Sequence, residues 1–169
     1  MSVTFLGTPV SVHGQLPKKG EKAPQFTLCD QTMTDIHIED FDGKKMVLNI
    51  FPSTDTPTCA TSIRSFNEAA KKLDNTVVLC VSADLPFALA RFVERYKLEH
   101  VSIASCFRSS DFAKSYGVAI TDGLLRGLTS RAVIVLDEHR HVLYSQLVSE
   151  IAEEPNYEQA IASINGEKE

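Results

Sequence analysis

Two continuously apolar runs constrain the fold more than any other feature: KMVLNIF at residues 45–51 and TVVLCVS at residues 76–82. Strands of this composition are buried on both faces, as in a parallel sheet whose crossover connections are helices. The segment between them is amphipathic at helical spacing, with an apolar side made of Ile63, Phe66, Ala70 and Leu73. The pattern predicts a β-α-β unit. A second helix over 86–98 and a short strand at 101–105 extend it to β-α-β-α-β.

The flanking segments predict further strands and helices. The opening VTFLGTPVSV predicts an N-terminal β-hairpin with a Gly-Thr-Pro turn, and two short strands are expected near residues 26–30 and 35–39. A short helix should end at Gly117. Residues 130–148 predict a second hairpin with its turn at DEHR, and a last helix is expected over residues 153–164. The expected fold is an α/β sandwich, with a mixed central sheet and helices on both sides, formed by a single domain over residues 1–169.

Composition and charge exclude several classes of partner. The 169 residues carry a formal net charge of −5 and contain no dense Lys/Arg cluster, which argues against nucleic acid and anionic membranes as partners. No apolar run approaches the roughly 20 residues that span a bilayer. The N-terminus has no basic start, apolar core or small-residue cleavage site, so we expect a cytoplasmic protein.

The four cysteines, Cys29, Cys59, Cys80 and Cys106, form no Cys-x-x-Cys pair, which argues against a zinc ribbon or a local dithiol. In a cytoplasmic chain of this size, individually placed reduced thiols are expected. His139 and His141 flank Arg140 in the DEHR turn region, and the sequence supplies no further ligands for a metal there. We therefore expect no metal site.

Cys59 lies where a thiol becomes reactive. Proline is favoured at the first helical position, so Pro57 makes Thr56 the N-cap and Cys59 the third residue of the helix. Unpaired backbone N–H groups and the helix dipole favour an anion there, and the thiolate is the reactive form of cysteine. The Thr56 hydroxyl precedes the sulfur by one turn, and Pro52 can shield the site from water. These residues predict an activated nucleophile.

The spacing Pro52-x-x-x-Thr56-x-x-Cys59 resembles the active-site motif of the peroxiredoxin family. Four colinear segments, at residues 47–68, 75–92, 112–137 and 144–161, extend the resemblance through essentially the whole chain. They indicate one branch of the family, the bacterial thiol peroxidases with two cysteines in an atypical arrangement. The resemblance implies a thioredoxin-like fold and peroxide reduction without metal or prosthetic group. It implies that Cys59 attacks the peroxide and becomes a sulfenic acid. Thr56 and Arg131 would polarise the attacked oxygen.

The chain departs from this branch at the resolving cysteine, whose usual position is occupied by Val93. Cys106 is the candidate replacement, because the carboxyl ends of parallel strands gather at one edge of a sheet. Cys80 fits a buried core thiol and Cys29 an ordinary strand residue. The alternatives are a one-cysteine cycle, in which an external thiol attacks Cys59 directly, or a disulfide between chains.

These features predict a cytoplasmic antioxidant enzyme, a thiol-dependent peroxidase acting on hydrogen peroxide and organic hydroperoxides. The resemblance implies thioredoxin or another thiol as reductant and a homodimer. It also implies that the loop at residues 122–128 lines an apolar groove for alkyl hydroperoxides and contributes to the dimer contact. A first alternative is a peroxide sensor or redox-regulated binding protein, which the missing resolving cysteine favours. A second is a cysteine acyl-transfer enzyme, which requires a general base, usually His, beside Cys59.

Overall fold

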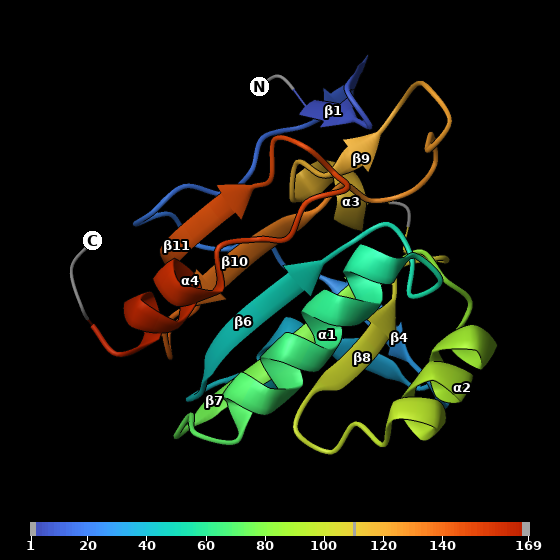
Figure 1. Cartoon of the computed structure of the whole chain (residues 1–169). Coiled ribbons are helices and arrows are strands. Elements are labelled where there is room, and N and C mark those ends of the chain that lie inside the picture. The colour runs from blue at the N-terminus through green and yellow to red at the C-terminus, as the bar shows by residue number, and fades with distance from the viewer. Residues whose placement is uncertain (1–2, 110, 167–169) are drawn as a thin grey trace.

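The computed structural model describes residues 3–109 and 111–166. A seven-stranded mixed sheet forms its centre, in the order β11-β10-β6-β7-β8-β4-β5 (Figure 1). Its three middle strands are parallel, as the two apolar runs predict: β6 (Lys45–Ile50), β7 (Thr76–Ser82) and β8 (Ser102–Ser105). Antiparallel strands complete both edges: β4 (Thr27–Asp30), β5 (Asp35–His37), β10 (Ala132–Leu136) and β11 (Val142–Leu147).

Helices cover both faces of the sheet, unevenly (Figure 1). One face carries the three long helices: α1 (Pro57–Ala70), α2 (Pro86–Tyr96) and α4 (Tyr157–Ile164). The other face is covered by the short helix α3 (Phe112–Ser115), the 3-10 helix η1 (Ile38–Phe41) and the irregular segment around residues 16–26. Within the described residues, no helix is long and apolar enough to cross a membrane.

The alternation of side chains along β6 divides the core into two apolar clusters. Val47 and Phe51 face α1 and pack with Phe66, whereas Leu48 and Ile50 face the opposite cluster. Each fully buried side chain of this kind stabilises the fold by about 1.5–3 kcal/mol. Because both faces of β6 are buried, its register is strongly specified, which fixes where the strand ends and α1 begins.

The N-terminal hairpin is confirmed, but the predicted Gly-Thr-Pro turn is wrong. Strands β1 (Val3–Phe5) and β2 (Thr8–Val10) are joined at Leu6 and Gly7, whose φ angles are 50° and 82°. Two central residues with positive φ match the right-handed twist of a two-residue hairpin, so Thr8 and Pro9 belong to the strand rather than the turn. The strand predicted to continue to Val12 ends at Val10, because Val12 begins β3 (Val12–His13), which pairs with β9 (Ala119–Ile120).

Candidate active site

Cys59 occupies the first turn of α1 and is completely buried. Thr56 is the N-cap, and its Oγ1 accepts a hydrogen bond from the Cys59 amide at 3.3 Å. The same hydroxyl donates to the Ser53 carbonyl at 3.2 Å, which orients its lone pairs toward the helix. Pro57 is the first helical residue, as predicted. The sulfur therefore lies near the N-terminal end of the helix, where the backbone favours negative charge.

Arg131 lies immediately before β10 and is 1% exposed. Its Nη2 donates to the Cys59 sulfur at 3.1 Å, and its Nε donates to the Ile151 carbonyl at 2.8 Å. Its Nη1 is buried and has no hydrogen-bond partner within the described part of the chain. A buried donor without a partner is costly, so this atom is available to an oxygen that enters beside the sulfur.

The pairing of Arg131 with Cys59 determines which chemistry the site can perform. A guanidinium keeps its positive charge in proteins and stabilises a thiolate or a developing oxyanion. It cannot accept a proton, so it cannot act as the general base that a cysteine acyl-transfer enzyme needs. The residue that contacts the sulfur is thus suited to electrostatic stabilisation and unsuited to acyl transfer.

Asp84 organises the loop before Cys59, and the sequence analysis did not identify it. Its carboxylate accepts hydrogen bonds from the Ser53 hydroxyl at 2.7 Å, the Thr54 amide at 2.8 Å and the Ser82 hydroxyl at 2.6 Å. Pro52 and Thr54 are buried in the same loop. The sequence did contain a signal for this role. Asp84 follows the end of β7, and the carboxyl ends of the parallel strands β6 and β7 lie at one edge of the sheet, next to the loop before Cys59.

A second missed contribution comes from the segment after β11. Besides the Ile151 carbonyl, this segment supplies the Ala152 carbonyl, which accepts from the Thr58 hydroxyl of α1 at 2.8 Å. The N-terminal hairpin holds the segment in place, because Thr4 exchanges backbone hydrogen bonds with Ser149 and Ile151. These contacts use main-chain carbonyls, for which no residue type gives a signal in the sequence.

The other three cysteines are buried and unpaired, and the structure does not bring Cys106 to Cys59. Both lie at the carboxyl edge of the sheet, but Cys106 belongs to the apolar cluster on the opposite face. Burial raises the pKa of the Cys106 thiol to about 11 and that of Cys80 to about 12. Cys29 lies in β4, separated from β6 by two strands. Cys106 and Cys80 are therefore protonated near neutral pH, and their thiols are weak nucleophiles.

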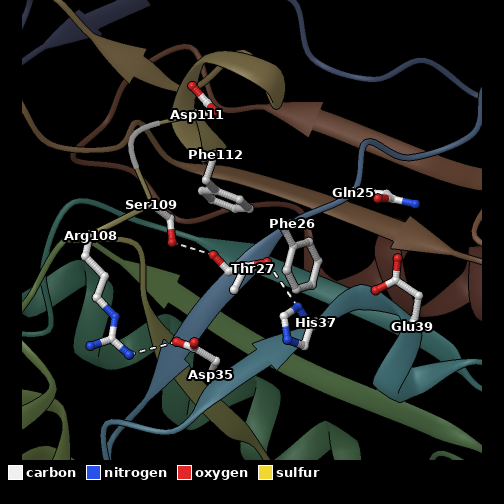
Figure 2. A pocket seen from close by; sticks show the side chains of 10 residues that line it. All are labelled: Gln25, Phe26, Thr27, Asp35, His37, Glu39, Arg108, Ser109, Asp111 and Phe112. Atoms are coloured by element: carbon white, nitrogen blue, oxygen red, sulfur yellow. Dashed lines mark hydrogen bonds and ion pairs between the residues drawn. The ribbon is translucent and has the colours of Figure 1, made fainter.

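A cavity of about 510 Å³ lies remote from Cys59. Figure 2 shows its side chains around β4 and β5, where Arg108 pairs with Asp35 at 2.7 Å and His37 contacts the Thr27 hydroxyl at 3.0 Å. Phe26 and Phe112, which line it, belong to the cluster on the far face of the sheet, and no cysteine lines it. In residues 3–109 and 111–166, no three His, Cys, Asp or Glu side chains gather as a metal site requires.

The loop at residues 122–128 packs mainly against the N-terminal hairpin. Leu125 and Leu128 contact a small cluster that includes Val3, Val10 and Ile151. Leu124 is 89% exposed at the tip of the loop. Since Ile151 also supplies the carbonyl that holds Arg131, the loop is connected to the site through this cluster.

Comparison with known proteins identifies the family. The Redoxin family profile matches residues 18–161. The thiol peroxidase of Vibrio cholerae serotype O1 is 47% identical over 164 residues, which cover 97% of this chain and all of that protein.

Solved structures of similar fold support the same family. A peroxiredoxin-like protein from Aquifex aeolicus superposes with a TM-score of 0.92 at 37% identity, covering 98% of this chain and 96% of that one. A thiol peroxidase from Chromobacterium violaceum also has a TM-score of 0.92, at 25% identity and the same coverage. None of these relatives favours a peroxide sensor over an enzyme. The chain therefore belongs to the redoxin family, has the thioredoxin-like peroxiredoxin fold, and is a thiol-dependent peroxidase of the bacterial thiol peroxidase branch.

Proposed function

We propose that Cys59 is the peroxide-reducing nucleophile of this peroxidase, that Thr56 and Arg131 polarise the peroxide, and that Pro52 shields the reaction from water. The observation that carries the proposal is the 3.1 Å contact between Arg131 Nη2 and the Cys59 sulfur, with both residues buried. The unpaired Nη1 of Arg131 supplies a second donor beside it. No metal or other cofactor takes part.

The reaction needs only these groups. The Cys59 thiolate attacks the terminal oxygen of ROOH, an S–O bond forms and the O–O bond breaks. The products are Cys59 sulfenic acid and an alkoxide or hydroxide, which takes up a proton and leaves as alcohol or water. The departing oxygen gains negative charge, and a guanidinium in a buried site stabilises that charge strongly. Hydrogen peroxide and organic hydroperoxides both fit this step.

We infer that the sulfenic acid is reduced by a thiol from outside the chain. Cys106, the candidate resolving residue, lies across the sheet from Cys59, and Val93 has no thiol to contribute. A Cys59–Cys106 disulfide would therefore require local unfolding, since a disulfide needs Cα atoms within about 7 Å. Thioredoxin is the reductant that the family resemblance suggests.

We further propose that the chain functions as one domain over residues 1–169, as a homodimer, in the cytoplasm. The Redoxin match across residues 18–161 supports a single domain. Large exposed apolar side chains, at Leu85, Phe87 and Leu124, support a protein contact, because such groups are costly in water. Four unpaired cysteines fit a reducing compartment. Light scattering coupled to size exclusion tests the dimer.

The function is tested by adding one equivalent of hydrogen peroxide to the reduced protein. Intact mass and a cysteine peptide map under non-reducing conditions then locate the modification, with Cys59→Ser as control. We expect one oxygen on Cys59 and three free thiols. A linked Cys59–Cys106 peptide would instead establish an internal resolving cysteine, and an unmodified Cys59 would refute the assigned nucleophile.

A further inference from the structure

A cleft between α1 and α2 is lined by three arginines, Arg64, Arg91 and Arg95, although the chain as a whole carries a net charge of −5. One cavity of about 490 Å³ is lined by the loop at residues 54–57 and by the α2 residues Ala88, Arg91, Phe92, Arg95 and Tyr96. A second cavity of about 370 Å³, which shares Tyr96 with the first, is lined in part by Arg64 and Glu68 of α1. We call the first of these the arginine cavity.

The arginines of this cleft are not used to hold the fold together by ion pairs. Arg64 and Arg95 stack on the Tyr96 ring, with guanidinium carbons 5.0 and 5.4 Å from its centroid. Neither they nor Arg91 form an ion pair with a carboxylate in the described part of the chain. The acidic residue that lines the arginine cavity is Asp55. The cavity therefore presents two arginines and one carboxylate to solvent.

The arginine cavity adjoins the first turn of α1. Thr56, which lines it, caps the helix and accepts a hydrogen bond from the Cys59 amide. Phe92, which also lines it, belongs to the same buried cluster as Cys59. A ligand in this cavity is thus next to the part of the chain that must open to expose the Cys59 sulfur.

We propose that the arginine cavity binds a small thiol that carries carboxylate groups and uses it to reduce the Cys59 sulfenic acid. The proposal rests on the proposed role of Cys59 and names the class of reductant. The ligand's sulfur attacks the Cys59 sulfur, an S–S bond forms, and the S–O bond breaks with release of water. A second molecule of the thiol attacks the mixed disulfide, restores the Cys59 thiol and leaves as the symmetrical disulfide.

The size and charge of the cavity fit this ligand class. Its volume falls within the roughly 300–1,000 Å³ of small-molecule sites. A guanidinium binds a carboxylate through two parallel hydrogen bonds, so Arg91 and Arg95 can each hold one carboxylate. Asp55 can accept the ammonium of an amino-acid moiety. Glutathione, a tripeptide thiol with two carboxylates and one ammonium, matches this arrangement group for group.

The test compares three thiols as reductants of the Cys59 sulfenic acid: glutathione, neutral 2-mercaptoethanol and cationic cysteamine. Protein oxidised with one equivalent of peroxide is mixed with each thiol, quenched and analysed by mass, with rates corrected for thiolate fraction. We expect glutathione to react about tenfold faster than 2-mercaptoethanol at low salt, and cysteamine more slowly than both. In the double variant Arg91→Gln, Arg95→Gln the glutathione preference should disappear. Arg108→Gln, an arginine near β5 on the far side of the sheet, is the matched control and should retain it.

Equal rates for all three thiols, or a double variant that slows every thiol alike, would overturn the proposal, as would reduction by thioredoxin alone. A second measurement does not depend on peroxide chemistry: titration calorimetry of the reduced protein with S-methylglutathione, which cannot react. Binding that weakens about tenfold in the double variant supports the cavity, and absence of binding rejects it. Failure of Cys59 to oxidise would instead reject the proposed nucleophile and leave the calorimetric result to decide the cavity.

Discussion

Replacing Arg131 with lysine should slow the peroxide step while keeping the positive charge. The guanidinium bonds the Cys59 sulfur and the Ile151 carbonyl at once, through Nη2 and Nε, and Nη1, which has no partner among the described residues, is the donor we propose for the peroxide. A single ammonium cannot occupy these three directions. Losing one hydrogen bond to a charged group costs about 1.5–3 kcal/mol, which corresponds to a rate about 10- to 150-fold lower.

The assay is rapid-quench oxidation of Cys59 by hydrogen peroxide, read by mass, because the chain contains no tryptophan to report by fluorescence. Arg126→Lys is the matched control, since Arg126 is exposed and, among the described residues, its side chain bonds the Gly123 carbonyl of its own loop. Urea unfolding of both variants separates a change in rate from a change in folded fraction. If Arg131→Lys reacts within about threefold of the parent and is equally stable, the directed hydrogen bonds of the guanidinium do not contribute to the peroxide step and the reasoning is refuted.

Three further outcomes are expected. Thr56→Val should lower the free energy of unfolding by about 1 kcal/mol and slow Cys59 oxidation, whereas Thr56→Ser should preserve both, as measured by urea titration and rapid quench. Asp84→Ala should cost about 2–4 kcal/mol by urea titration, because two donors of the loop before Cys59 and the Ser82 hydroxyl at the end of β7 lose their acceptor. Burial raises the pKa of Cys80 to about 12, so the unfolded chain releases this proton first, and stability should fall from about pH 9 toward pH 12 by up to about 1.4 kcal/mol per pH unit. Unfolding measured across this range should show a shallower slope in Cys80→Ala.

The boundary between β6 and α1 could be predicted from the sequence because strong local signals agree there. A doubly buried strand ends, Thr56 caps the next helix and Pro57 starts it, and the structure places all three as expected. The approach of Arg131 to Cys59, 72 residues away, has no such local signal. It was suggested by family resemblance alone. The hydrogen bond from Arg131 to Ile151 uses a main-chain carbonyl as acceptor. Neither local sequence patterns nor the family resemblance indicated this bond.

For Cys106, the sequence predicted the edge of the sheet but not the face. The rule for parallel strands placed it correctly at the edge where Cys59 lies, since it directly follows β8. The rule says nothing about which face a side chain takes. That is set by alternation along the strand, and Ala104 and Cys106 share the face opposite Cys59. Counting along β8 therefore places Cys106 on the face of Ala104, whereas the position of α1 places Cys59 on the other face.

The complete burial of Cys59 means that the size of a reagent limits both whether it can reach the sulfur and how fast it can react with it. A bulky electrophile meets the sulfur only while the first turn of α1 is open, so its labelling rate should level off at high reagent concentration. The plateau equals the opening rate and is the same for every bulky reagent, whatever its intrinsic reactivity. The thiol is thereby protected from large cellular oxidants and alkylators by kinetics.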